Sequence, residues 1–217
     1  MVTIINFPQG SSSWLEWRRA KRMASESSIV TGRNPWQKPI QLARVKRGLE
    51  TVRVNPAMQR GHEYEPVARS WYEATTGQIG DPVVIELGDY GCSLDWGNSD
   101  LTRICEIKVP SSASSDLWKM VNDNVVPEYY LDQICHQLAV TGAERCDFVV
   151  HLPEEQAFRL IEVEPMPDRW DEILMAWDAF WNTYMVGGLP DDERTDTVWI
   201  SACEACRPTA EELATTP

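Results

Sequence analysis

Hydrophobic and polar positions along the chain follow two periods, one typical of helices and one typical of strands. Apolar residues three and four apart, bounded by Ser, Pro or Gly, predict helices beginning near Ser11 and Ser25 and further helices over residues 39–47, 56–76, 127–140 and 167–185. Alternating or β-branched runs predict strands over residues 83–87, 90–95, 102–109, 145–151 and 157–163. This order predicts an α/β domain with a mixed central β-sheet flanked by helices on both faces.

The helix over residues 56–76 has the clearest limits. It begins at Pro56 and stops at Gly77. Its apolar stripe, which we expect to face the sheet, consists of Tyr64, Val67, Ala68, Trp71 and Tyr72. Turns at residues 88–89 and 97–100 separate the three strands that follow.

Composition indicates one globular domain. The chain has 217 residues, of which 43% are hydrophobic and 24% charged, and this is an ordinary globular balance. We expect a single domain over residues 1–190, made of a basic helical part (1–60), a core (61–142) and a second hairpin with a long helix (143–190), followed by an acidic extension (191–217). The chain has no bilayer-spanning apolar run, and its first residues lack the basic start and long apolar core typical of a signal peptide. Its six cysteines are scattered, so we expect reduced thiols and a cytoplasmic location.

Charge is distributed unevenly. The net charge is −13, but residues 1–60 carry a balance of +8 and residues 61–217 carry −21. DNA affinity depends on the phosphates neutralised at the contact and not on the total charge, so a basic first quarter suggests a local anion-binding surface. The alternative is that Arg18, Arg19, Lys21 and Arg22 form a solvated helix face.

The strongest chemical signal is a motif of three residues, in which Asp95 precedes Glu106 and Lys108 along the chain. Two carboxylates that converge from neighbouring strands can hold a hard divalent cation, because Mg²⁺ prefers oxygen ligands. Lys108 lies two residues after Glu106, so it points to the same face and can orient or help deprotonate a metal-bound water. Such a site suits phosphodiester hydrolysis. Glu-x-Lys also occurs in solvated strands, so the motif alone does not exclude a structural strand.

Several other residues carry weaker signals. Glu65, on the long helix, can support the same cation or a second one, although an exposed glutamate is the simpler reading. His62 precedes it by one turn and is more typical of a helix surface. Cys203 and Cys206 form a single CxxC, which cannot complete a zinc site without two further ligands. Most of the ten tryptophans are expected in the core, but three near the basic segment can stack on bases: Trp14, Trp17 and Trp36.

Four segments together resemble the lambda-type phage exonucleases, the YqaJ family of viral recombinases in the PD-(D/E)xK superfamily. They are Trp14-Leu-Glu-Trp-Arg-Arg19 with Ala24-Ser-Glu26, Arg60-Gly-His-Glu-Tyr-Glu65 with Thr76-Gly77, Ser93-Leu-Asp95 with Glu106-Ile-Lys-Val-Pro110, and Tyr130-Leu-Asp-Gln-Ile-Cys-His-Gln137. They cover residues 14–142. The resemblance implies a restriction-endonuclease-like fold. Residues 143–217 match only in general pattern.

The resemblance also implies roles in cutting. Asp95 and Glu106 would bind Mg²⁺, with Mn²⁺ as a substitute and two ions during catalysis, and the Ile107 carbonyl and Glu65 would assist. Lys108 would position or activate the attacking water, and Gln133 would contact Lys108 or the nucleophile. The alternative for Gln133 is a simple amide on the helix surface. Ser93, two residues before Asp95, would bind the phosphate near the cut.

Further roles concern the DNA end. The resemblance implies that Arg18 and Ser25 hold a 5′-terminal phosphate, a role that suits the guanidinium fork and a serine near a helix N-terminus. Met23 replaces a hydroxyl residue there, and Arg19 can compensate. Met58 occupies the place of an apolar wedge between the terminal bases, with a buried methionine as the alternative.

The resemblance implies processive 5′→3′ digestion of linear double-stranded DNA to mononucleotides, leaving a 3′ single strand for recombination. The resemblance further implies a ring-shaped homotrimer, a phage or prophage origin and a single-strand annealing protein as partner. The competing functions are an endonuclease of the same superfamily, a non-catalytic DNA-binding assembly protein and a CxxC redox or zinc protein.

Overall fold

The computed structural model describes residues 2–7, 10–52 and 54–190. The first part of the chain forms short elements: β1 (Thr3–Ile4), α1 (Ser12–Ala20), β2 (Arg22–Met23), the 3-10 turn η1 (Ala24–Glu26), α2 (Ser27–Val30) and α3 (Pro39–Lys46). Ser11 caps α1 as predicted, because its hydroxyl accepts a hydrogen bond from the Trp14 N–H at 3.2 Å. The predicted acidic extension, residues 191–217, lies outside the described residues.

The remaining elements alternate between strands and helices. They are α4 (Pro56–Thr76), β3 (Gly80–Leu87), β4 (Tyr90–Asn98), β5 (Arg103–Lys108), α5 (Asp116–Asn122), α6 (Glu128–Thr141), β6 (Arg145–Leu152), η2 (Pro153–Glu155), β7 (Ala157–Val163), α7 (Pro167–Phe180) and the π-helical turn η3 (Trp181–Val186). Gly77 ends α4 in the left-handed conformation, where the sequence predicts a stop, and Gly142 ends α6 in the same way.

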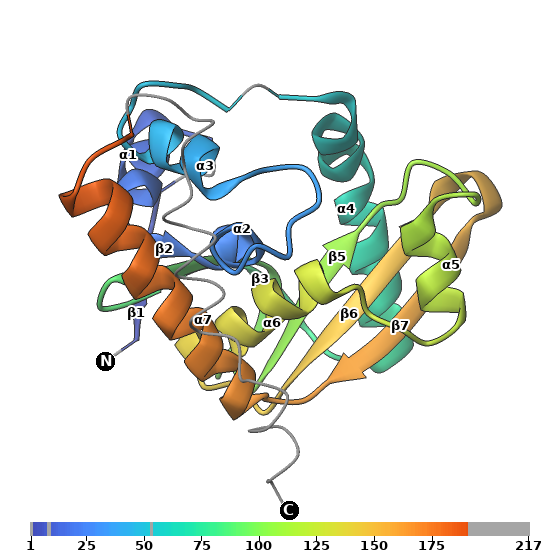
Figure 1. Cartoon of the computed structure of the whole chain (residues 1–217). Helices are drawn as coiled ribbons and strands as arrows, with labels where there is room; N and C mark the ends of the chain where they lie inside the picture. The colour runs from blue at the N-terminus through green and yellow to red at the C-terminus, as the bar shows by residue number, and fades with distance from the viewer. Residues whose placement is uncertain (1, 8–9, 53, 191–217) are drawn as a thin grey trace, which may run out of the picture.

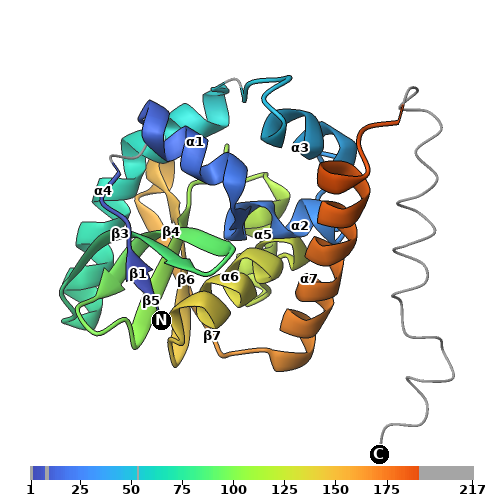
Figure 2. The same cartoon turned by 90° about the vertical axis from the view of Figure 1, so that its left-hand side faces the viewer.

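The strands form the predicted mixed sheet (Figure 1). Its order is β1-β3-β4-β5-β6-β7, and β2 adds to the edge of β4. β5 and β6 run parallel, as do β2 and β4, and the other neighbours are antiparallel. Viewed from the side, α4 lies on one face of the sheet and α6 on the other, with α7 outside α6 (Figure 2).

Three apolar clusters hold the layers together. On one face, Ala68 and Tyr72 of α4 pack on Trp96, Cys105 and Val149. On the other face, α6 contributes residues such as Ile134 and Leu138 to the largest core. Outside α6, a third cluster joins α7 to α2 and α3. The sheet is thus covered on both sides, which fixes the positions of side chains at the end of β5.

Some predictions require correction. Val67 was expected in the buried stripe of α4 but is 51% exposed, because it lies on the outer side of the helix beside Pro66. α5 was not predicted, since its seven residues make fewer than two full helical turns and are too few to show a clear helical period; Leu117, Trp118 and Val121 are its buried residues. β4 continues through Gly97 and Asn98, which were expected in a turn. The last helix changes to a π-helical turn after Phe180.

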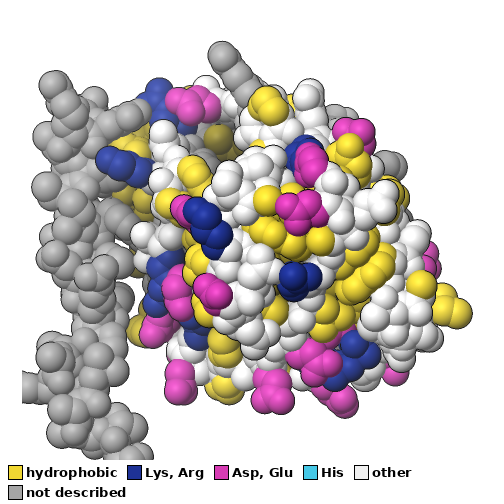
Figure 3. Space-filling model, turned by 90° about the vertical axis from the view of Figure 1, so that its right-hand side faces the viewer, with side chains coloured by type: hydrophobic (Ala, Val, Ile, Leu, Met, Phe, Trp, Pro, Cys, Tyr) yellow, Lys and Arg dark blue, Asp and Glu magenta, His cyan; other side chains and the backbone are white. Residues whose placement is uncertain are grey.

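The basic first quarter is largely neutralised within the molecule. Its ion pairs are Arg18–Glu26, Lys21–Glu86, Arg22–Asp178, Arg33–Asp132, Arg33–Glu172, Arg44–Glu50, Lys46–Glu26 and Arg60–Glu154. Arg19 and Lys38 are exposed and form no ion pair with any described residue. On the face shown in Figure 3, basic and acidic side chains are interspersed around apolar ones. Many of the basic residues of the first quarter are therefore paired with acidic residues of the same molecule.

None of the described helices has the length and apolarity needed to cross a membrane. Cys92, Cys105, Cys135 and Cys146 are buried free thiols, in agreement with the expected reduced state. Cys203 and Cys206 lie outside the described residues.

Candidate active site

A β-bulge and a local separation of strands shape the site. Asp81 pairs with Gly97, whereas Val83 pairs with Leu94, so β4 contains one extra residue opposite Pro82. β4 pairs with β5 only at Trp96 and Gly97. Beyond this point the Asp95 carboxylate, and not a backbone carbonyl, accepts the Ile107 N–H at 2.7 Å. Bulges bend a strand and re-aim side chains near active sites, and here the bulge places Asp95 against β5.

The same geometry exposes the backbone of Ile107 to the site. The N–H and C=O of a strand residue point to the same edge. Since the Ile107 N–H points to Asp95, its carbonyl faces the gap between β4 and β5 as well. The Asp95 carboxylate therefore lies near Glu106 at this gap, and the Ile107 carbonyl lies along the same strand edge.

Glu106 is the buried centre of the site, with 1% exposure. Its Oε1 accepts hydrogen bonds from Lys108 Nζ and from Gln133 Nε2, the latter at 2.6 Å. Its Oε2 accepts a hydrogen bond from Gln137 Nε2 at 2.6 Å. A buried carboxylate is tolerated only when it is paired and hydrogen-bonded, and three donors meet that need here.

Lys108 shares the face of Glu106, as predicted. Burial alone would lower the pKa of Lys108, but the charges of Glu106 and Asp95 outweigh it and raise that pKa well above its ordinary value. The ammonium group also lies 5.2 Å from the centre of the Tyr130 ring. In this arrangement Lys108 is a cation that donates hydrogen bonds.

For Asp95, burial and neighbouring charge disfavour the ionised form of the side chain. Burial, and then the negative charge of Glu106, raise the pKa of Asp95 well above its ordinary value, while Lys108 opposes this rise. Glu65 also contributes to the rise, which places its charge near the site. Arg69 connects α4 to β4, because it forms an ion pair with Glu65 of α4 and donates a hydrogen bond to the backbone carbonyl of Asp95 in β4 at 3.0 Å.

The two residues predicted to hold a 5′-phosphate also meet. Arg18 Nη2 donates a hydrogen bond to Ser25 Oγ at 2.9 Å and lies 3.4 Å from Glu26. Ser25 belongs to η1, which packs on β4 and α6, the elements that carry Asp95 and Gln133. The helix after η1 has only four residues, so the anion-binding strength expected from its N-terminus is small. Arg19 is exposed on the same helix as Arg18.

The other predicted residues have mixed outcomes. The bulge interrupts the alternation that would place Ser93 on the face of Asp95, and Ser93 Oγ is buried without a partner among the described residues. Met58 lies in the first turn of α4 and is 38% exposed, so it is not the buried methionine of the alternative reading. His62 is exposed. Trp14 and Trp17 are buried, and only Trp36 of the three candidate stacking tryptophans is open to solvent.

Three residues of the site were missed from sequence. Gln137 follows Gln133 by one helical turn, so the spacing could have indicated a second amide on the same face. Arg69 follows Glu65 by the same interval and forms an i,i+4 pair. Tyr130, which lies beside Lys108, gave no signal that separates it from a core aromatic.

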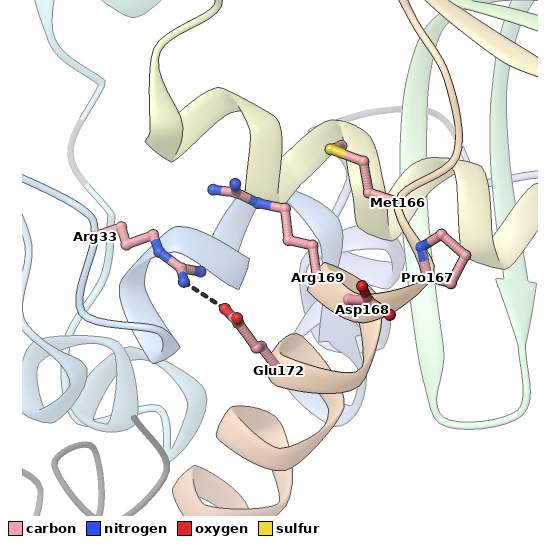
Figure 4. Close-up of a pocket in the computed structure, with 6 residues that line it drawn as sticks. All are labelled: Arg33, Met166, Pro167, Asp168, Arg169 and Glu172. Atoms are coloured by element: carbon pink, nitrogen blue, oxygen red, sulfur yellow. Dashed lines mark hydrogen bonds and ion pairs between the residues drawn. The ribbon is translucent and has the colours of Figure 1, made fainter. Parts of the chain in front are cut away.

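A separate hollow lies between the loop after α2 and the start of α7 (Figure 4). Its volume is about 430 Å³, and it is lined by Arg33, Met166, Pro167, Asp168, Arg169 and Glu172. Arg33 and Arg169 both bind the buried Asp132, and Arg33 also pairs with Glu172. The hollow contains none of the predicted catalytic residues, and its two guanidinium groups are already engaged.

Relatives of the chain come from a bacterium and a virus. Uncharacterized protein YqaJ of Bacillus subtilis (strain 168) is 28% identical over 191 residues, which cover 84% of this chain and 59% of YqaJ. Uncharacterized protein R354 of Acanthamoeba polyphaga mimivirus is 28% identical over 169 residues, which cover 67% of this chain and 29% of R354. The chain therefore spans less than two thirds of the length of these relatives.

Solved structures show the same fold. The alkaline exonuclease LHK-Exo from Laribacter hongkongensis has a TM-score of 0.67 at 28% identity, over 82% of this chain and 94% of that chain. LHK-Exo has also been solved in complex with dAMP. A phage related exonuclease from Haemophilus somnus 129PT shares the fold, with a TM-score of 0.61 at 13% identity, over 77% and 96% of the two chains.

A family match extends over the region that builds the site. Residues 13–144 match the family described as the YqaJ-like viral recombinase domain. This range contains the carboxylate pair, Lys108, Gln133 and Gln137, and it exceeds half of the 217 residues. The chain therefore belongs to the YqaJ-like viral recombinase domain family and has the mixed α/β fold of the alkaline exonucleases.

Proposed function

We propose that this chain is a Mg²⁺-dependent 5′→3′ exodeoxyribonuclease that digests linear double-stranded DNA processively to mononucleotides and leaves a 3′ single strand for recombination. The observation that carries this proposal is the convergence of Asp95, Glu106 and Lys108 where β4 and β5 separate. Membership of the family supports it, as does the fold shared with alkaline exonucleases. LHK-Exo binds dAMP, a nucleoside monophosphate of the kind that such digestion releases.

The donor set fits a hard divalent cation. Burial and the negative charge of Glu106 raise the pKa of Asp95, and a cation bound between the two carboxylates would relieve this repulsion. No cluster of three His, Cys, Asp or Glu side chains suited to a metal ion occurs in the described part of the chain, so the Ile107 carbonyl would supply the third oxygen. These oxygen ligands suit Mg²⁺ and also Mn²⁺. Glu65 would support a second ion.

The metal would supply Lewis acidity toward the phosphate and lower the pKa of a bound water. Lys108 is protonated in this arrangement, so it would hold the attacking water or a phosphate oxygen by donating a hydrogen bond. Gln133 donates to the same Glu106 oxygen as Lys108 and thereby fixes where the ammonium group lies. Gln137 holds the other oxygen and prevents rotation of the carboxylate.

Selection of DNA ends would depend on the N-terminal part of the chain. Arg18 and Ser25 would hold a 5′-phosphate, and Arg19 would add a cation at the same helix. In this role Arg18 would exchange its contact with Glu26 for the phosphate. Met58, exposed at the start of α4, would separate the terminal base pair. We further propose a homotrimeric ring around the DNA and a single-strand annealing protein as partner.

The experiment that tests this function uses linear duplex labelled at either the 5′ or the 3′ end, incubated with the full chain and Mg²⁺. We expect the 5′ label to appear first as mononucleotide, and we expect EDTA to stop the reaction. A closed circular duplex serves as a second substrate, and its efficient cutting would favour an endonuclease of the same superfamily. DNA binding without digestion of any substrate would favour a non-catalytic assembly protein.

A further inference from the structure

We infer that Trp36 and Lys38 form a subsite for an unpaired nucleobase of the DNA end, separated from Lys108 by the rings of Tyr129 and Tyr130. The inference rests on the proposed function for the identity of the ligand. Trp36 keeps 69% of its surface exposed, although most tryptophans in the described residues are buried or half-buried. An exposed tryptophan ring offers a π-face on which any base can stack.

A series of aromatic rings connects Trp36 to the active site. The Trp36 ring lies 4.9 Å from the Tyr129 ring, and Tyr129 lies 4.5 Å from Tyr130. The Lys108 ammonium group then lies 5.2 Å from the centre of Tyr130. In Figure 1 the loop between α2 and α3 projects toward the start of α6 and the end of β5. A base that stacks on Trp36 would therefore belong to the same DNA end that reaches Lys108.

The loop that presents Trp36 is held firmly. Asn34 Oδ1 accepts hydrogen bonds from the Trp36 and Gln37 N–H groups, both at 2.9 Å. Asn34 is itself bonded to Ser28, through its backbone N–H at 2.8 Å and its amide at 3.1 Å. Since Ser28 is buried, the ring is presented from a fixed base, which lowers the entropic cost of stacking.

The charges near Trp36 suit a nucleotide. Lys38 is exposed and has no ion pair with a described residue, so its ammonium group can approach a phosphate. The acidic groups on the Tyr129 side are Glu128, which pairs with Arg169, and Asp116, which is paired with Lys119. The Trp36 ring could stack on a base while Lys38, two residues away, contacts the phosphate of the same nucleotide.

DNA binding by the full chain in EDTA tests the inference, because the metal-free state separates binding from cutting. The substrates are a blunt duplex and duplexes with ten-nucleotide 5′ or 3′ overhangs, and binding is followed by fluorescence anisotropy. We expect Trp36→Ala to weaken binding to at least one overhang by roughly 10-fold, with little change for the blunt duplex. Trp36→Phe keeps an aromatic face and should stay within roughly 3-fold of wild type.

Two controls make the result specific to base stacking. Ile79→Ala removes a side chain that is 86% exposed in the loop after α4, and it should change nothing. An overhang of abasic sites keeps the phosphates but lacks bases, so wild type should bind it as weakly as Trp36→Ala does. Thermal unfolding of each variant checks that the fold is retained.

The outcomes distinguish the subsite from the proposed function. Equal binding of overhangs by wild type and Trp36→Ala would overturn the subsite, and would leave a protein partner as the occupant of this loop. The subsite would also be overturned if wild type bound an abasic overhang as tightly as an overhang that carries bases. Failure of wild type to digest any DNA would instead overturn the proposed function, while a specific loss of overhang binding in Trp36→Ala would still support a base-binding subsite.

Discussion

Gln137 donates a hydrogen bond of 2.6 Å to Glu106 Oε2, on the carboxylate whose other oxygen contacts Lys108 and Gln133. An ionised carboxylate only accepts hydrogen bonds, so both glutamines must present their N–H groups to it. The helix α6 thereby fixes the orientation of Glu106 from two successive turns. This relationship makes α6 part of the candidate active site and not only a cover of the sheet.

We predict that Gln137→Ala lowers activity by roughly 10- to 100-fold, the usual effect of losing a group that orients a metal ligand. The Mg²⁺ concentration needed for half-maximal activity should rise as well. Mn²⁺ binding, measured by calorimetry without DNA, should weaken in parallel. Gln78→Ala, in the loop after α4, is the matched control. Unchanged Mn²⁺ affinity in Gln137→Ala would show that this amide does not position the ligand.

Lys108→Ala should reduce the rate of digestion by roughly 100-fold or more, because it removes the charged donor nearest to the carboxylate pair. DNA binding measured in EDTA should stay close to wild type, since the ammonium group is held by Glu106 in the free protein. Lys108→Arg keeps the charge but changes the geometry, and we expect only partial recovery. Normal digestion by Lys108→Ala would remove this residue from the mechanism.

Arg18→Ala should weaken the preference for a 5′-phosphate. Loss of a charge-assisted hydrogen bond costs about 1.5–3 kcal/mol, so kcat/KM should fall by roughly 10-fold or more on 5′-phosphorylated duplex. The same duplex with a 5′-hydroxyl should be digested by wild type and variant at similar rates. An equal loss on both substrates would assign Arg18 a structural role, for which its contacts with Ser25 and Glu26 offer a basis.

Stability should fall in mild acid through His136. Its ring is fully buried, with Nδ1 2.7 Å from Ser27 Oγ, and burial, followed by the charge of Lys46, lowers the pKa of His136 to about 3. The unfolded chain has a histidine pKa of about 6.5. Below that pH the unfolded state binds a proton that the folded state does not bind.

The free energy of unfolding should therefore decrease as the pH falls from 6.5 toward 3, by up to about 1.4 kcal/mol per pH unit from this group. Urea unfolding at pH 7.5, 5.5 and 4.5 measures the slope. His136→Asn removes the titrating ring, so its slope should be smaller by that amount. Identical slopes in the two proteins would show that His136 is not protonated differently on unfolding.

Much of the fold was predictable because the signals are local. Ser11, Gly77 and Gly142 mark helix ends through short-range capping, and Glu106 and Lys108 share a face because strand side chains alternate. The bulge at Asp95 was not predictable, since it depends on pairing between β3 and β4. The ion pair of Arg22 with Asp178 joins residues 156 positions apart, and no local pattern indicates it.

The extra residue in β4 also limits which changes of chain length the protein can accept. If one residue were deleted between Leu94 and Gly97, β3 and β4 could pair without interruption, and the sheet could still form. Asp95 or its replacement would then follow the regular alternation and lose its place beside the Ile107 N–H. Insertions and deletions at this position should therefore be rare among active relatives.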